Sequence, residues 1–491
     1  MKIQFGEYLP DMPALDNQGA RVAKNVVPMG TSYQPFYAAV VYSNALTARC
    51  QGAISTKDKD GNSLTYAGDA TKLYKLSSAA YSDVSLSGGY TIAADDLWQF
   101  TRFGGRLIAT NFSEYPQTIN VPLGTNFANL TTALKARYVT TMRNFVVFAN
   151  TYDASDGNVP HRIRWSALDD PTDYTVSPTT QSDFQDLDAS SGWIKQIVGG
   201  EYGVVFQERA ITRMTYSGSP TIWQFDEVEK GKGTIAPGSV CKAGNIIFYL
   251  GLDGFYAFDG TQSIPIGANK VDKTFFSEVD ANYINRITST ADFDNQVIYW
   301  LYAASDNSNG VPNKILAYNY SPNAQKRWSY IEPGDIEIIF ISLSEGYTLE
   351  TLDNISASLD SLPYSLDSRV WTGENYILSG FNSAHKHVNF TGSAMDATVE
   401  TGEFQIYPSN RALVSLVRPL IDGGSTITVQ MGTRNTQAEE VSYASSVSIN
   451  STGNCPVRSN ARYHSIRVNV TGGFTHAQGV QIEKATKSGE R

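Results

Sequence analysis

KLYKLSSAAYSDV, residues 72–84, has the same plan as ILAYNYSPNAQKRWSYI, residues 315–331. Each stretch has a strand of apolar and aromatic residues, a polar turn, and a short strand that begins with Tyr or Trp. Further copies of this unit have their first strands at residues 106–109, 162–165, 211–214 and 255–258. One such unit cannot bury its apolar face alone, so a repeated array indicates stacked sheets. Four-stranded sheets set around an axis form a β-propeller, and the six copies predict six blades.

Runs of consecutive apolar residues mark a second strand in several of these units, at residues 145–148, 203–206, 246–249 and 296–300. Such continuous runs suit strands that are covered on both faces, as the strands of neighbouring blades are. Dipeptides typical of hairpin turns punctuate the same region, at residues 104–105, 199–200, 253–254 and 259–260.

The chain divides into four predicted segments. Residues 1–35 predict an extended arm, because four prolines interrupt any regular helix or central strand. Residues 36–345 hold the six-bladed propeller, and residues 346–385 predict a turn-rich connector. Residues 386–491 predict a C-terminal β domain, in which apolar and polar residues alternate along each strand. That alternation indicates a small antiparallel β-sandwich with one dry and one wet face.

The pair Leu-Asp recurs at a seven-residue interval in the predicted connector, at residues 352–353, 359–360 and 366–367. A heptad interval is typical of a coiled coil, but Pro363 and many serines oppose a long helix. Three aspartates could also bind a calcium ion, although the dense Asp/Asn/Gly loop of calcium sites is missing. We therefore expect a solvated connector with an apolar side chain turned inward at each repeat.

Charge and cysteine content exclude several classes of protein. The chain has 491 residues, a formal net charge of −10 and no long basic run, which argues against tight nucleic-acid binding but not against letting nucleic acid pass. Cys50, Cys241 and Cys455 are far apart and odd in number, so we expect reduced, half-buried thiols rather than disulfides or structural zinc. We also expect no signal peptide and no membrane span, because no window approaches 18 apolar residues.

The common catalytic motifs are missing from the sequence, so we expect no catalytic residue, no cofactor, no metal site and no enzyme activity. The stretch GKGT at residues 231–234 is similar to part of a phosphate loop. It lacks the upstream glycines, and a lysine-bearing turn between blades four and five is the better interpretation. His385 and His387 would share one face of a strand and could hold a metal with a third ligand, but a surface pair is favoured.

An enzymatic alternative stays open, because six-bladed propellers include sialidases and other glycoside hydrolases. Those enzymes need two placed carboxylates, or an arginine cluster for an acidic sugar. Four arginines lie in adjacent predicted blades, namely Arg162, Arg164, Arg209 and Arg213. The repeated turn typical of sialidases is missing, and arginine at alternating positions is also ordinary on a sheet surface. A carbohydrate-active, sialidase-like or glycan-binding propeller is therefore the second hypothesis.

Five stretches of the chain carry a resemblance to a known family. They are QGARVAKNVVP at residues 18–28 with YQP at 33–35, WSALDDPTDY at 165–174, GLDGFY at 251–256, RYHSIRV at 462–468 and HAQGV at 476–480. Together they resemble the propeller-type tail nozzle proteins of short-tailed bacteriophages, also called tail accessory or packaged-DNA-stabilisation proteins.

The resemblance implies a structural virion protein that forms a hexameric ring in the phage tail. Such a ring lies below the portal and adaptor proteins, continues the channel that retains and ejects double-stranded DNA, and anchors tail fibres or spikes and a needle or plug. A virion protein assembled in the bacterial cytoplasm needs no signal peptide and no disulfide. An acidic balance suits a conduit, because a like-charged wall does not retain phosphates. Rings form through heterologous interfaces that close by rotation.

Overall fold

The computed structural model describes residues 1–491 except residues 78, 308, 345–357, 359–374, 409 and 490–491. Strands dominate the described part of the chain, and its one α-helix, α1 (Asp272–Glu278), has seven residues. Three short 3-10 helices accompany it, η1 (Ala189–Ser191), η2 (Pro237–Ser239) and η3 (Ala281–Arg286). The prediction of an all-β fold is confirmed. None of the described helices is long and apolar enough to cross a membrane.

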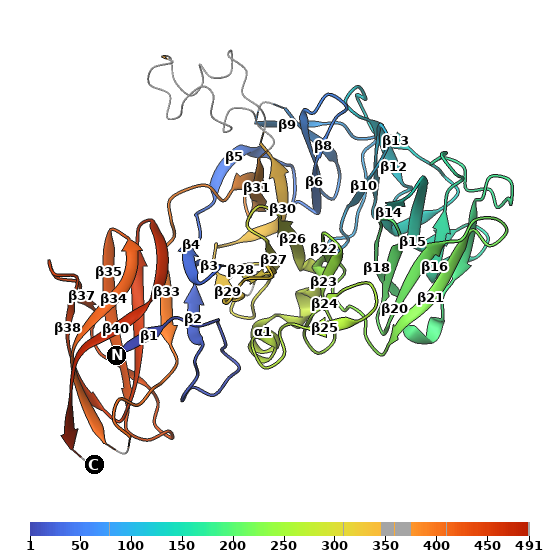
Figure 1. The fold of residues 1–491 in the computed structure, drawn as a ribbon. Coiled ribbons are helices and arrows are strands. Elements are labelled where there is room, and N and C mark those ends of the chain that lie inside the picture. The colour runs from blue at the N-terminus through green and yellow to red at the C-terminus, as the bar shows by residue number, and fades with distance from the viewer. Residues whose placement is uncertain (78, 308, 345–357, 359–374, 409, 490–491) are drawn as a thin grey trace.

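Five four-stranded antiparallel sheets and the first four strands of a ten-stranded sheet follow one another from residue 52 to residue 331 (Figure 1). Those four strands are counted below as the sixth sheet of the series. The first three consist of β6 (Gly52–Lys57), β7 (Ser63–Gly68), β8 (Leu73–Ser77) and β9 (Ala80–Asp83); β10 (Gln99–Phe103), β11 (Arg106–Thr110), β12 (Gln117–Asn120) and β13 (Ala128–Asn129); and β14 (Lys135–Met142), β15 (Phe145–Asp153), β16 (Gly157–Trp165) and β17 (Asp183–Asp186). The next three consist of β18 (Ile194–Val198), β19 (Gly203–Gln207), β20 (Ala210–Tyr216) and β21 (Trp223–Lys230); β22 (Cys241–Ala243), β23 (Ile246–Leu250), β24 (Phe255–Phe258) and β25 (Ser263–Pro265); and β26 (Thr288–Asp292), β27 (Val297–Tyr302), β28 (Lys314–Asn319) and β29 (Trp328–Ile331).

The six repeated units of the sequence lie in six different sheets of this series. Four of them form the third and fourth strands of their sheet. Residues 162–165 belong to a third strand, β16, but Tyr174 lies in the loop before the fourth strand, and residues 106–109 form a second strand, β11. The continuous apolar runs form the second strands β15, β19, β23 and β27, which are almost entirely buried. The prediction that both faces of these strands are covered is therefore confirmed.

A seventh four-stranded sheet in the described chain corrects the predicted number of six. It pairs β30 (Ile336–Leu343), β31 (Tyr376–Asn382) and β32 (Lys386–Asn389) with β5 (Val40–Ala45). The repeat pattern misses this sheet because a long segment separates β30 from β31, and because its outer strand comes from the other end of the chain. Period-two alternation shows which face of a strand is buried but does not name its partner.

The predicted connector, residues 346–385, lies mostly outside the described residues, and so do its three Leu-Asp pairs. The part that is described departs from the prediction of turns, because residues 376–382 form β31. Residues 386–389, at the start of the predicted C-terminal domain, form β32 in the same seventh sheet.

The first strands of the seven sheets lie beside one another in a propeller-like order. Strand β14 contacts β10 on one side and β18 on the other, and β26 contacts β22 and β30. Between β18 and β22, the amide of Gln196 donates to the carbonyl of Pro237 in η2 at 3.4 Å. Because β30 also contacts β6, the last sheet of the series lies beside the first.

A six-stranded sheet and the rest of the ten-stranded sheet pack together at the C-terminal end of the chain (Figure 1). One contains β1 (Lys2–Gln4), β3 (Val26–Met29), β4 (Ser32–Pro35), β40 (Phe474–Gly489), β34 (Arg411–Gly423) and β38 (Cys455–Ala461). The other continues outward from β29 through β2 (Ala20–Lys24), β33 (Ala397–Thr401), β39 (Tyr463–Thr471) and β35 (Thr426–Arg434) to β36 (Ser442–Tyr443) and β37 (Val447–Ser448). Strand β38 is alternately buried and exposed at every residue, as the sequence predicts for a strand with one dry face.

The N-terminal segment joins the two parts of the molecule. Its strands β1 and β4 pair with β40, and β2 lies between β29 and β33. Asn25, in the left-handed backbone region at φ 57°, bonds both sides. Its backbone N–H donates to the carbonyl of Tyr330 at 2.8 Å, and its side-chain amide donates to the carbonyl of Asp396 at 2.9 Å. The predicted arm thus contributes strands to the C-terminal sheets.

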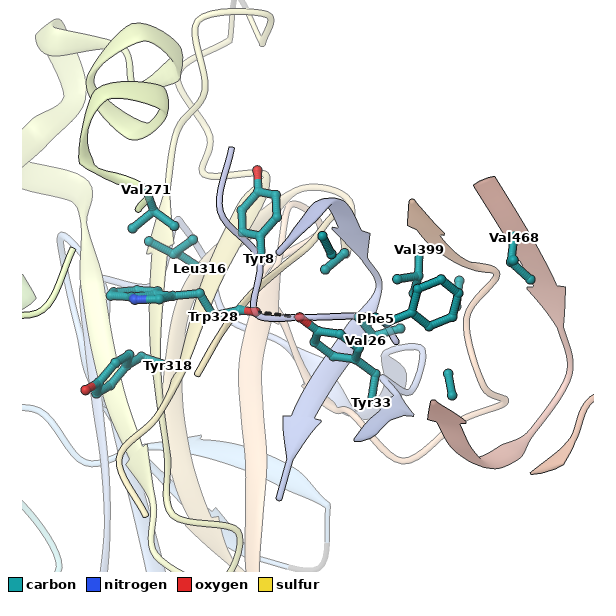
Figure 2. Packing of buried hydrophobic residues seen from close by; sticks show 14 of the residues in the cluster. Phe5, Tyr8, Val26, Tyr33, Val271, Leu316, Tyr318, Trp328, Val399 and Val468 are labelled. Carbon is teal, nitrogen blue, oxygen red and sulfur yellow. Dashed lines mark hydrogen bonds between the residues drawn. The ribbon is translucent and has the colours of Figure 1, made fainter. Parts of the chain in front are cut away.

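One hydrophobic core runs through this joint. Figure 2 shows Trp328 and Leu316 on the side of the seven sheets, Val399 and Val468 on the side of the C-terminal sheets, and Tyr33 between them. The hydroxyl of Tyr33 donates to the carbonyl of Trp328 at 3.4 Å and to that of Gly6 at 2.9 Å. The two parts of the molecule therefore share one densely packed core.

Candidate functional site: a central cavity and an adjoining polar pocket

A cavity of about 410 Å³ lies among the first strands of the sheets. Its lining comes from β6, β10, β22, β26 and β30 and from Gln196 of β18. The one charged residue of this lining is Lys242, whose ammonium donates to the carbonyl of Gly199 at 2.8 Å. The cavity wall is therefore nearly neutral.

Polar side chains of the central cavity bond to the backbone of neighbouring sheets. The amide of Gln51 donates to the carbonyls of Ala93 at 2.8 Å and Asp96 at 2.7 Å. The hydroxyl of Ser289 donates to the carbonyl of Gly238 at 2.8 Å. These groups hold adjacent sheets together, so the central cavity serves the architecture first.

A second pocket, of about 260 Å³, adjoins this cavity and shares Leu97 and Gln99 with it. It lies at one end of β10, β14 and β18, and we call it the polar pocket. Its lining is Asp95, Asp96, Leu97, Gln99, Asn111, Arg137, Tyr138, Asn150, Trp193, Lys195, Pro237 and Asn285. Three neighbouring sheets and η3 therefore contribute to one small concave surface.

The charged groups around the polar pocket are arranged as ion pairs. Three contacts carry the pairing: Arg137 to Asp96 at 2.7 Å, Arg286 to Asp95 at 3.0 Å and Lys195 to Glu208 at 3.1 Å. The guanidinium of Arg137 also lies over the ring of Phe112, 4.4 Å from its centroid. Three cations thus face three carboxylates, and the pocket has no net charge from these groups.

Asn111 and Trp193 are the two unusual residues of the polar pocket. Asn111 is only 2% exposed, and its side-chain oxygen accepts a hydrogen bond from the backbone of Glu114 at 3.0 Å. Its side-chain nitrogen is buried and finds no hydrogen-bond partner among the described residues. Trp193 is 50% exposed, although indole rings are usually well buried. The lining of the pocket therefore contains one buried donor without a described partner and one half-exposed indole.

The four arginines of the enzymatic alternative do not line this pocket. Arg162 is buried and bonds the carboxylates of Asp153, Asp156 and Asp186 within its own sheet. Arg164 donates to the carbonyl of Tyr174 at 2.9 Å, in the same sheet.

The other two arginines belong to the next sheet. Arg209 donates to the carbonyl of Ser190 at 3.1 Å, and Arg213 lies 3.8 Å from Asp226. Two of the four arginines therefore lie in the third sheet and two in the fourth, and each is bonded within its own sheet or the loops beside it.

His385 and His387 do not form the predicted surface pair. His385 has a left-handed backbone at φ 59° and bonds the buried carboxylate of Glu337, so the alternation of faces is broken there. His387 is buried between aromatic rings, and the hydroxyl of Tyr81 lies 3.2 Å from its Nδ1. Burial lowers the pKa of His387 to about 4. No cluster of three or more His, Cys, Asp or Glu side chains that could hold a metal occurs in the described ranges.

The remaining predicted sites are structural. Residues 231–234 form a turn between the fourth and fifth sheets, as predicted, and Lys232 donates to Glu229 at 3.3 Å and to the carbonyl of Ser263 at 3.2 Å. All three cysteines are free and buried, more deeply than predicted. Burial raises the pKa of Cys455 to about 11, so its thiol stays protonated at neutral pH.

Sequence reasoning missed every residue of the polar pocket. Its lining comes from seven separate stretches between residues 95 and 285, and none of them forms a motif. The one local signal is the turn before β18, where a tryptophan, Trp193, follows Gly192. A large aromatic residue at the start of a strand is not by itself a signal of binding.

The comparisons with known proteins identify no family for this chain. No protein-family model matches the chain, and no curated protein matches it. Among solved structures, a computationally designed protein called Ika8 is similar, with 8% sequence identity and a TM-score of 0.38 over 72% of this chain and 99% of that one. A likeness at that TM-score carries no argument about this protein.

Proposed function

We propose that this protein is a structural component of a short-tailed bacteriophage virion. In this proposal the seven sheets form a seven-bladed β-propeller, and copies of the chain form a ring-shaped tail nozzle, a hexamer as the resemblance implies. The ring extends the DNA channel below the portal and adaptor, retains the packaged DNA, guides its ejection and anchors fibres, spikes or a needle. It resides in the virion tail and assembles in the host cytoplasm.

The position of the resembling stretches carries this proposal. Residues 18–28 form β2 and β3, residues 462–468 belong to β39, and residues 476–480 belong to the part of β40 that pairs with β1. Phe255, from residues 251–256, packs against Trp328 with ring centroids 5.7 Å apart. Four of the five stretches therefore build the joint between the propeller-like part and the C-terminal sheets.

A joint with a shared core suits a mechanical component. Tail proteins hold pressurised DNA, so a unit whose two parts share one core transmits load without hinging. The net charge of −10 supports a conduit, because DNA phosphates are repelled by an acidic wall. Large side chains on the surface, among them Tyr37, Val40 and Val41, offer contact area for neighbouring subunits.

The assembly state tests the proposal. The purified full-length chain should be imaged by electron microscopy and weighed by analytical ultracentrifugation, alone and after mixing with the adaptor and portal proteins encoded beside it. We expect sixfold rings that join the adaptor coaxially. A chain that stays monomeric in the mixture, with no adaptor-bound ring, would overturn the proposal.

The carbohydrate-active alternative receives no support from its arginines. An acidic sugar needs free guanidinium groups that converge on one site. Arg162 is committed to three carboxylates, and Arg213 belongs to a different sheet. Turnover of a sialylated oligosaccharide that is lost in Arg162→Ala or Arg213→Ala would restore this alternative.

A further inference from the structure

We propose that the polar pocket binds one ring of a neutral saccharide. The proposal names a site and a ligand class for the glycan-binding alternative, and it stands or falls independently of the ring assembly. Four features of the pocket carry it: an unused buried donor, a half-exposed indole, balanced charges and a small volume.

The side-chain nitrogen of Asn111 requires an acceptor. A buried donor without a partner costs on the order of 1–3 kcal/mol. The backbone of Glu114 occupies the oxygen of the same amide, so the amide cannot turn over to relieve the nitrogen without losing that bond. Asn111 belongs to the lining of the pocket. In this proposal a small local shift lets an oxygen of the ligand reach the N–H and satisfy it.

Trp193 supplies a flat apolar surface beside this donor. The indole is half exposed. The ammonium of Lys195, a residue of β18, lies 5.6 Å from the centroid of the indole ring. The negative face of an aromatic ring attracts weakly positive C–H groups. A pyranose ring has such C–H groups on its faces and hydroxyl groups around its edge, so it can stack on Trp193 while its edge reaches Asn111.

The charges of the polar pocket select a neutral polyol. Asp95 and Asp96 can accept hydrogen bonds from hydroxyl groups, and Arg137 can donate to them. A phosphate or an acidic sugar would meet two carboxylates, and a cationic ligand would meet Arg137 and Lys195. Hydroxyl groups both donate and accept, so they match this mixed lining without the cost of burying an uncompensated charge.

The volume limits the ligand to one ring. Pockets for drug-sized molecules are usually about 300–1,000 Å³, and the polar pocket measures about 260 Å³. A single sugar ring would fill it, and the rest of a longer glycan would lie outside on the surface of the second to fourth sheets.

Binding to the full-length protein tests the proposal directly. The probes are the methyl glycosides of glucose, galactose, mannose and N-acetylglucosamine, together with maltose, lactose and cellobiose. Saturation-transfer NMR and tryptophan fluorescence report binding. We expect at least one neutral probe to bind, whereas N-acetylneuraminic acid and inorganic phosphate do not.

Variants locate the site. Asn111→Ala and Trp193→Ala are each expected to weaken binding of the best probe about tenfold, the loss typical of one buried hydrogen bond or aromatic contact. Trp193→Phe retains a ring and should retain part of the affinity. Phe276→Ala, which removes a partly exposed aromatic residue on α1 outside the pocket, is the matched control and should bind normally.

Three results would overturn the proposal. The first is that no neutral probe binds, as for a pocket that holds water only. The second is that Asn111→Ala and Trp193→Ala leave binding unchanged while their melting temperatures match that of the parent. The third is that an anion binds in preference to the neutral probes. None of these results bears on the ring assembly, and a monomeric chain that binds saccharide would leave this proposal intact.

Discussion

The carboxylate of Asp11 caps helix α1 by bonding to Thr274, 263 residues further along the chain. It accepts a hydrogen bond from the backbone N–H of Thr274 at 2.8 Å and another from its hydroxyl at 2.6 Å. The other oxygen of Asp11 accepts from the backbone of Lys273 at 2.7 Å. A carboxylate at the first turn of a helix satisfies orphan N–H groups and compensates the helix dipole. The N-terminal segment is thus attached to the fifth and sixth sheets by a cap as well as by strands.

Asp11→Ala should loosen this attachment. Loss of an N-terminal cap costs about 0.5–2 kcal/mol, and the neighbouring pair Lys270–Glu7 at 3.0 Å would remain. We expect faster cleavage of the N-terminal segment in limited proteolysis, with a melting temperature lowered by a few degrees. Asp60→Ala, at an exposed turn, is the control and should change neither measurement. Equal cleavage rates for Asp11→Ala and the parent would show that the strands alone hold the segment.

Trp328→Ala should destabilise the whole molecule, because Trp328 lies fully buried at the joint. Its indole N–H donates to the carbonyl of Ile266 at 3.1 Å, and its ring packs on Trp300 and Tyr318. Truncation of a buried tryptophan costs about 3–5 kcal/mol. Urea unfolding followed by circular dichroism measures the loss. Trp193→Ala should cost little by comparison, and a similar loss for both variants would contradict the assignment of the joint as the shared core.

Asp272 should make stability fall as the pH rises. Burial, opposed by the hydrogen bond from Phe255 and helped by the charges of Asp11 and Asp253, raises the pKa of its carboxyl from 3.8 to about 6. Between these two values the folded protein binds the proton and the unfolded chain has released it, so the free energy of unfolding decreases from about pH 4 to about pH 6. A difference of about two pKa units between the folded and unfolded states corresponds to roughly 3 kcal/mol of unfolding free energy.

Asp272→Asn removes this titration. The variant keeps a side-chain oxygen that can accept the hydrogen bond from the backbone of Phe255, which is 3.1 Å long in the parent. The difference in the free energy of unfolding between variant and parent should therefore shift in favour of the variant from pH 4 to pH 6. Urea titrations at several pH values measure it. A difference that stays constant across this range would contradict the predicted pKa.

His387 should have the opposite effect in the seventh sheet. Burial lowers its pKa from 6.5 to about 4. The unfolded chain takes up a proton first, so the stability present above pH 6.5 is lost as the pH falls toward 4. His387→Phe should show a shallower loss on acidification, after a constant penalty for the lost bond to Tyr81. Unfolding measured from pH 7 to pH 4 tests this, and parallel curves for variant and parent would refute it.

Much of the strand content was predictable, because burial leaves a local mark. Second strands such as β15 and β27 are covered on both faces, and their unbroken apolar runs follow from that environment. The alternation in β38 follows from one face in contact with the core. The polar pocket was not predictable, since Asn111 and Trp193 acquire their roles only from residues of other sheets.

The sequence alone determined the all-β class, six of the seven four-stranded units of the propeller-like series, and the dry and wet faces of the C-terminal strands, because side-chain periodicity records burial. The tertiary structure alone decided that Val41 on β5 pairs with Val388 on β32 to complete the seventh sheet, and that the N-terminal strands lie between the two parts of the molecule. Backbone hydrogen bonds between distant segments are the same for every residue type except proline, so they leave no trace in the local pattern.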